Sequence, residues 1–96
     1  MTGWRANYQV VHHAEVIATV DVAFVASRVA VEIDGWAYHS DPARFQADRR
    51  RQNRLVSAGW TVLRFTWHDL TTRPDEVIHT LRSVLRGKIS DSGPDV

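Results

Sequence analysis

The sequence predicts a single α+β domain in which flanking helices cover a mixed four-stranded sheet. Three short segments rich in β-branched and aromatic residues come first, and a helix, a fourth such segment and a second helix follow. Three strands joined by short turns form an antiparallel meander, and the helix after them crosses over to the fourth strand. A chain of 96 residues can bury roughly 60–70 % of its extended surface, which suffices for one core.

The first three strands are predicted over residues 8–13, 16–24 and 29–34. In the third of them, the large apolar residues Val29, Val31 and Ile33 alternate with Ala30, Glu32 and Asp34. This period of two is typical of a strand that presents two different faces. Gly35 then ends the strand.

Capping and breaking residues place the next two elements. Asp41 is a good N-cap, and Pro42 fits the first helical position because its missing N–H is not needed there. The helix should run to about Ala58, since Gly59 favours a helix end. Residues 60–67 then read as a largely buried fourth strand.

A last helix begins near Pro74, and its apolar side chains fall on one face. Residues 87–96 are rich in Gly, Ser, Asp and Pro. We therefore expect a flexible tail over residues 87–96 behind a domain of residues 1–86.

The charge is unevenly distributed, although the formal net charge is only +1. Residues 1–40 hold two arginines and four acids, whereas residues 44–54 hold five arginines. Because the chain has no cysteine, disulfides and thiolate metal sites are excluded, and carboxylates and histidines are the candidate metal ligands. No segment approaches the ~20 apolar residues of a membrane span, so we expect a soluble cytoplasmic protein without a membrane partner.

Three carboxylates are predicted to meet on one face of the sheet. The four-residue connection between the second and third strands forces an antiparallel hairpin, in which Phe24 can pair with Val29. This register places Asp21 opposite Glu32, whereas a slip of two residues places it opposite Asp34. Both registers keep the three carboxylates on one face, with opposed Cβ atoms about 5 Å apart.

Like charges at this separation destabilise a sheet unless a cation or hydrogen bonds compensate. A hard dication, Mg²⁺ or Mn²⁺, binds carboxylate oxygens and takes a substrate phosphate as a further ligand. The cluster therefore suits metal-dependent phosphodiester hydrolysis. The alternative is an open sheet face with ordinary surface acids, but the flanking Trp36 and Tyr38 and the arginine-rich helix argue against an open face.

Several segments carry a resemblance to a known family. They are Val-Asp-Val-Ala-Phe (20–24), Val-Ala-Val-Glu-Ile-Asp-Gly-Trp-Ala-Tyr-His (29–39) and Gly-Trp-Thr-Val-Leu-Arg-Phe (59–65), together with Arg44, Asp48, Arg51 and Leu55. Through them, residues 18–70 resemble an endonuclease-like family of unknown function that is related to very-short-patch-repair (Vsr) mismatch endonucleases. The resemblance implies a PD-(D/E)xK, restriction-endonuclease-like core and DNA as the substrate.

The resemblance also implies roles for individual residues. Asp21 resembles the metal-binding aspartate of the motif, and Glu32 resembles its second acid. Asp34 stands where restriction enzymes carry lysine and Vsr-type nucleases histidine, and His39 matches a further active-site histidine that could act as general base or acid. With Lys88 as the sole lysine, the lysine role of the motif is unfilled, so a water on the metal, oriented by His39 or a carboxylate, would have to supply the nucleophile.

The sequence departs from the family pattern at its start. Family members usually carry a helix before the first strand, and that helix often contributes an acid. Here only residues 1–7 precede the first predicted strand. We therefore expect this chain to lack the first helix of the family.

Arginines of the first helix are candidate phosphate contacts: Arg44, Arg49, Arg50, Arg51 and Arg54. Arginine contacts of this kind hold DNA in position without reading its sequence. The alternative is a solvated helix face on which Arg44, Asp48 and Arg51 form ion pairs. Trp36 and Tyr38 could stack on an unpaired base or could simply pack.

The sequence thus predicts an Mg²⁺-dependent (or Mn²⁺-dependent) DNA endonuclease acting in repair, defence or a toxin–antitoxin system. Asp21, Glu32 and Asp34 would hold metal, and His39 would move protons. The alternative is a catalytically inactive nucleic-acid-binding module of the same fold. A second copy of the chain or a partner protein is also left open as an interaction partner.

Overall fold

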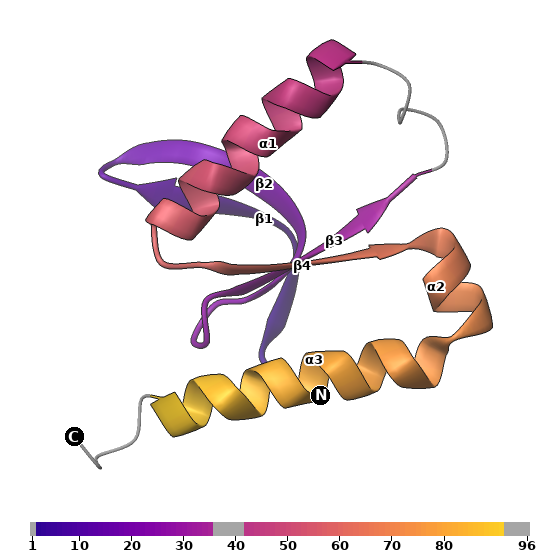
Figure 1. Ribbon diagram of the computed structural model, residues 1–96. Coiled ribbons are helices and arrows are strands. Elements are labelled where there is room, and N and C mark those ends of the chain that lie inside the picture. The colour runs from indigo at the N-terminus through magenta and orange to yellow at the C-terminus, as the bar shows by residue number, and fades with distance from the viewer. Residues whose placement is uncertain (1, 36–41, 92–96) are drawn as a thin grey trace.

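A computed structural model describes residues 2–35 and 42–91 of the protein. It contains one mixed sheet in the order β1-β2-β3-β4 (Figure 1). The first three strands form an antiparallel meander, and β4 pairs in parallel with β3. The elements are β1 (Trp4–His12), β2 (Glu15–Phe24), β3 (Val29–Asp34), α1 (Pro42–Ser57), β4 (Thr61–Thr66), α2 (Trp67–Thr72) and α3 (Pro74–Asp91). The predicted fold class, a restriction-endonuclease-like α+β domain, is confirmed.

Helices cover the two faces of the sheet, with α1 on one side and α3 on the other (Figure 1). Each helix packs on its own hydrophobic cluster. The α1 cluster consists of Val10, Ala18, Val20, Ala23, Ala30, Leu55, Ala58 and Trp60. The α3 cluster consists of Phe24, Val29, Val31 and Leu81. Alternate residues of β3 therefore face opposite helices, which confirms the period of two in its sequence.

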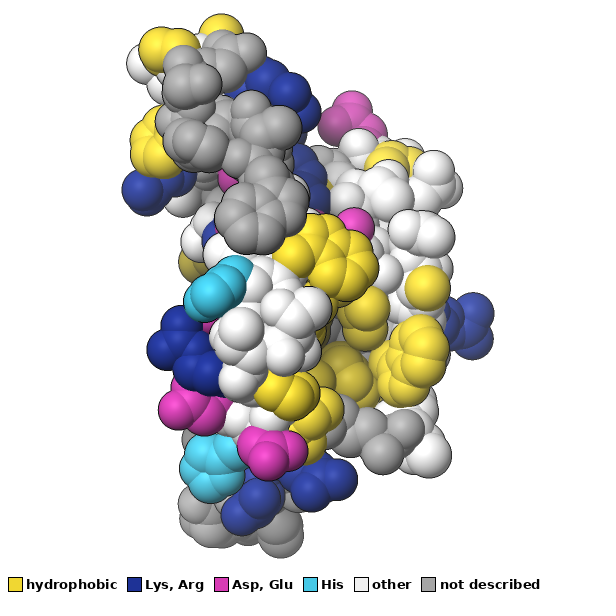
Figure 2. Space-filling view, turned by 90° about the vertical axis from the view of Figure 1, so that its right-hand side faces the viewer, with side chains coloured by type: hydrophobic (Ala, Val, Ile, Leu, Met, Phe, Trp, Pro, Cys, Tyr) yellow, Lys and Arg dark blue, Asp and Glu magenta, His cyan; other side chains and the backbone are white. Residues whose placement is uncertain are grey.

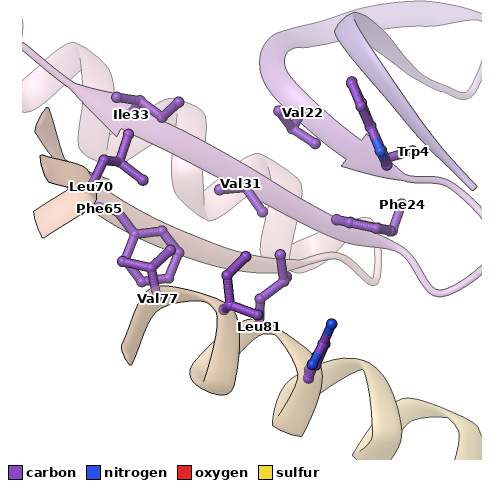
Figure 3. A pocket seen from close by; sticks show the side chains of 11 residues that line it. Trp4, Val22, Phe24, Val31, Ile33, Phe65, Leu70, Val77 and Leu81 are labelled. Atoms are coloured by element: carbon purple, nitrogen blue, oxygen red, sulfur yellow. The ribbon is translucent and has the colours of Figure 1, made fainter. Parts of the chain in front are cut away.

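The α3 side of the sheet holds an apolar pocket of about 340 Å³ that opens between the sheet and α3 (Figure 3). Side chains such as Phe24, Val31, Phe65 and Leu81 line it. Figure 2, which views the molecule from the side of α2, shows hydrophobic side chains gathered in one area with charged side chains beside it. The lining is almost entirely apolar, so this pocket offers no group for acid–base chemistry or metal binding.

The structure corrects two predicted boundaries and adds one helix. The first strand begins at Trp4, earlier than residue 8. The short helix α2 was absent from the predicted order, although Thr66 and Asp69 form a capping box at its start. The last helix continues through Gly87 to Asp91, where a flexible tail was predicted. A helical glycine costs only about 1 kcal/mol relative to alanine and keeps its N–H, so it does not end this helix; the rest of the predicted tail lies outside the described residues.

In the described part of the chain, no helix combines the length and hydrophobicity that crossing a bilayer requires.

Leu55 tests the α1 cluster, because its side chain is 0 % exposed while that of the neighbouring Val56 is 55 % exposed. We expect Leu55→Ala to lower the free energy of unfolding by about 2–5 kcal/mol, since it leaves a cavity in the core. Val56→Ala should change it by no more than about 0.5 kcal/mol. Urea denaturation followed by tryptophan fluorescence measures both, and equal effects would contradict this placement of α1.

Candidate active site

The hairpin of β2 and β3 adopts the first of the two predicted registers, with Phe24 opposite Val29. Its ladder stops at the pair Val22–Val31. One step further, Asp21 Oδ2 accepts a hydrogen bond of 2.8 Å from the backbone N–H of Ile33. A side-chain carboxylate thus takes over as acceptor at the point where the two strands separate, which holds Asp21 beside β3.

The ladder on the other side of β2 is interrupted at the same level. Ala6 pairs with Val22 and Tyr8 with Val20, but Asn7 between them has a φ of 49° and does not pair. Asparagine tolerates this left-handed conformation better than most residues. Asp21, the residue facing Asn7, therefore lies where β2 is regular on neither side.

The strand also changes its packing at Asp21. Ala18 and Val20 belong to the α1 cluster, whereas Val22 and Phe24 pack in the α3 cluster. Side chains two apart on a regular strand would share one face. The irregularity at Asp21 therefore lets β2 contribute to both cores and sets this aspartate between them.

Glu32 is the buried charge of the site, with a residue exposure of 6 %. Its Oε1 accepts a hydrogen bond from Arg51 Nη2 in a close ion pair. Burial raises the pKa of Glu32 above its ordinary value of 4.5, and the charge of Asp21 adds to the increase, while the hydrogen bond and charge of Arg51 oppose it. Asp21 and Glu32 thus interact electrostatically, as the predicted register requires.

Arg51 joins three parts of the fold. Besides Glu32 on β3, it donates to the backbone oxygen of Thr19 on β2 at 2.9 Å. It also donates to Asp48 Oδ1 on its own helix at 3.3 Å. The ion pair between Asp48 and Arg51, predicted as the alternative for this helix face, is therefore confirmed.

Asp34 is held by a different arginine. Arg64 donates to its two carboxylate oxygens at 3.2 and 3.4 Å. The same guanidinium donates to Asp48 Oδ2 at 2.5 Å and to Gln52 Oε1 at 2.9 Å. Burial alone would lower the pKa of Arg64, but the hydrogen bond to Asp34 and the nearby negative charges outweigh it, so this pKa is raised.

The carboxylates therefore differ in what they can offer a cation. Both oxygens of Asp34 contact Arg64, and no group of three or more possible metal ligands is found within residues 2–35 and 42–91. Asp21 Oδ1 and Glu32 Oε2 accept no hydrogen bond from a described residue. Carboxylate oxygens of this kind fit Mg²⁺, which binds through one or two carboxylates, waters and substrate phosphate. The three-ligand set of Asp21, Glu32 and Asp34 stays a prediction.

The five candidate arginines of α1 fall into two groups. Arg44, Arg51 and Arg54 line an open groove of about 490 Å³ together with Asp48. Of the other two, Arg49 lies over the Phe45 ring, with its guanidinium carbon 4.8 Å from the ring centre. Arg50 is exposed to solvent and is not among the residues of the groove.

Some predicted site residues lie outside the described part of the chain, namely Trp36, Tyr38, His39 and the N-cap residue Asp41. Other residues were missed. Arg64 sits opposite Glu32 in the parallel ladder of β3 and β4, and Gln52 supports it. A polar residue inside the apolar run of residues 60–67 was the available signal for Arg64.

The raised pKa of Glu32 predicts a specific pH dependence of stability in the absence of metal. Its contribution is fully present below about pH 4.5 and is lost as the pH rises through the higher folded-state pKa. The variant Glu32→Gln cannot titrate, so the wild-type free energy of unfolding minus that of the variant should fall with rising pH. Urea denaturation between pH 4 and pH 8 with a chelator measures this difference. A difference that grows with pH would show that attraction to Arg51 outweighs burial.

A sequence model of the REase_MTES_1575 family matches residues 3–85. The matched range begins before β1 and includes Asp21, Glu32, Asp34 and the arginines of α1. No curated protein and no solved structure matches the chain. Because the family model covers most of the sequence, the protein belongs to the REase_MTES_1575 family of restriction-endonuclease-like domains.

Proposed function

We propose that this protein is a metal-dependent endonuclease that hydrolyses phosphodiester bonds of DNA. Membership of a restriction-endonuclease-like family points to a nuclease. The observation that carries the proposal is the placement of two carboxylates, Asp21 and the buried Glu32, on facing strands at the opening of the β2–β3 ladder. A relation to Vsr endonucleases and the PD-(D/E)xK superfamily, and a role in repair, defence or a toxin–antitoxin system, belong to the same proposal.

Asp21 and Glu32 would hold Mg²⁺ or Mn²⁺ through oxygens that accept no hydrogen bond from a described residue. When bound, the cation supplies Lewis acidity to the phosphodiester and to the attacking water. In the net reaction one P–O bond breaks, the water oxygen binds phosphorus, and a proton reaches the leaving oxygen. His39 keeps its predicted role in carrying that proton.

The remaining site residues position these two acids. The Ile33 N–H fixes one oxygen of Asp21, so its other oxygen has a defined place. Arg64 ties Asp34 to Asp48 and thereby joins β3 to α1. We therefore propose Asp34 as a positioning residue for this network.

The groove along α1 is the proposed path of the DNA backbone. Arg44 and Arg54, which line it with Arg51, are separated by ten positions, or about 15 Å along a helix. This length can follow more than one phosphate of a strand, and guanidinium contacts of this kind hold DNA without reading its sequence. Binding by these side chains should weaken steeply as salt increases.

A second function is favoured by a specific observation. Glu32 and Asp34 each have an arginine partner, so their charges are compensated without a metal ion. This arrangement suits a catalytically inactive nucleic-acid-binding module that keeps the fold. The two functions differ in whether the purified protein turns over DNA.

The variant Asp21→Asn separates them. We expect the wild-type protein to nick supercoiled plasmid with Mg²⁺ or Mn²⁺ and not with a chelator. Asp21→Asn should lower the nicking rate by more than about 100-fold, because it removes a charged metal ligand. With a chelator present, its DNA affinity, measured by gel shift, should stay within about threefold of wild type, a difference below about 1 kcal/mol.

The matched control is Asp75→Asn, the same change at an exposed aspartate in the first turn of α3, which should nick like wild type. A wild-type protein that binds DNA but never nicks it would establish the inactive module instead. Nicking that survives Asp21→Asn would remove Asp21 from the site.

A further inference from the structure

The ion pair between Arg51 and Glu32 would compete with a metal ion for Glu32. Among the described residues Arg51 is the one cation in an ion pair with Glu32. Glu32 is also one of the two acids proposed to hold a dication. A guanidinium and a dication on one small carboxylate repel each other in a buried setting, where charges are poorly screened. The ion pair seen here therefore opposes metal binding at Glu32.

Arg51 can move away from Glu32 without leaving a buried hydrogen-bond acceptor unpaired. Asp48, its second partner, keeps a hydrogen bond of 2.5 Å from Arg64. The hydrogen bond to the Thr19 backbone oxygen is exposed, so water can replace Arg51 there. Glu32 would receive the cation in exchange, so all three acceptors stay satisfied.

Arg51 also has a place to go. Its side chain is 23 % exposed, and it lines the groove with Arg44 and Arg54. This groove is the proposed phosphate path, and the guanidinium of Arg51 contacts Glu32 beside it. A shift away from Glu32 therefore keeps the guanidinium beside the site while turning it toward a bound phosphate.

We propose that Arg51 is an exchangeable counter-ion: it neutralises Glu32 in the free protein, yields Glu32 to the metal, and then contacts the phosphate that is cleaved. The inference rests on the proposed function and names the residue that supplies the positive charge which no lysine of the described site can supply. Arginine suits this task because its planar fork binds carboxylate and phosphate in the same way. Arg64, held by Asp34, Asp48 and Gln52, stays in place as a structural cation.

The first test measures metal binding without DNA. Calorimetric titration of Mn²⁺ should show about tenfold tighter binding to Arg51→Gln than to wild type, because a competing cation has been removed. The control Arg86→Gln makes the same change of charge at an exposed position of α3 and should bind Mn²⁺ like wild type. A residue that merely supports the fold would give weaker Mn²⁺ binding on loss of Arg51, and unchanged or weaker binding overturns the proposal.

The second test asks whether the phosphate contact depends on metal. With a chelator present, the affinity of Arg51→Gln for a DNA duplex should be within about twofold of wild type, since wild-type Arg51 is then paired with Glu32 and does not contact DNA. In Ca²⁺ the same variant should bind about tenfold more weakly, a loss typical of one charged phosphate contact. Equal losses under both conditions would overturn the exchange.

Turnover completes the test and keeps the two proposals apart. Arg51→Gln should nick plasmid about 100-fold more slowly at saturating Mn²⁺. Arg51→Lys restores the charge and should recover most of that loss. If Arg51→Gln does not fold, the nicking rate of Arg51→Lys tests the role of the charge instead. Wild type that neither binds Mn²⁺ nor nicks would defeat the proposed function. Wild type that nicks, with Arg51 variants matching it in rate and Mn²⁺ affinity, would defeat only the inference about Arg51.

Discussion

The burial of a single carboxylate, that of Glu32, is the constraint on which the arrangement depends. A buried charge is tolerated only when it is paired and hydrogen-bonded, so α1 must deliver a cation to this point of the sheet. Arg51 does so, and Leu55, one helical turn further along the same face, enters the α1 cluster. The rotation of α1 over the sheet is thereby fixed by an ion pair and an apolar contact together.

The sheet adapts to the same requirement. Its β2–β3 ladder opens beyond Val22 and Val31, and the Asp21 carboxylate accepts the Ile33 N–H there. Asp21 and Glu32 then lie on facing strands while each keeps a defined partner. The second ion-pair group, in which Arg64 links Asp34 to Asp48, holds β3, β4 and α1 together beside them.

The fold could be predicted from local patterns. The alternation in residues 29–34 gave the bounds of β3, and Pro42 and Gly59 bracket α1 within one or two residues. The six-residue helix α2 could not be predicted because it is too short to show a helical period. At the end of α3, composition was a poor guide, since one glycine does not stop a helix whose apolar face is packed.

The site could be predicted only in part, for a physical reason. Hairpin geometry is local, so the sequence predicts that Asp21 lies near Glu32. The partners of Glu32 and Asp34 come instead from α1 and β4, and their contacts depend on how a helix is rotated over a sheet and on the register of a parallel pair. No spacing along the chain encodes either quantity, which is why the sequence predicts Arg51 at a phosphate and assigns Arg64 no role.

The irregularities of β1 also bear on strand addition at this edge of the sheet. β1 is an outer strand of the described sheet, and an outer strand is a template on which a second chain can add. Asn7 and the bulge between Val10 and Val11 divide its paired residues into three short stretches: Trp4–Ala6, Tyr8–Val10 and Val11–His12. A strand added to β1 would meet an irregularity within three residues, so the distortion beside Asp21 also makes this edge a poor template for strand addition.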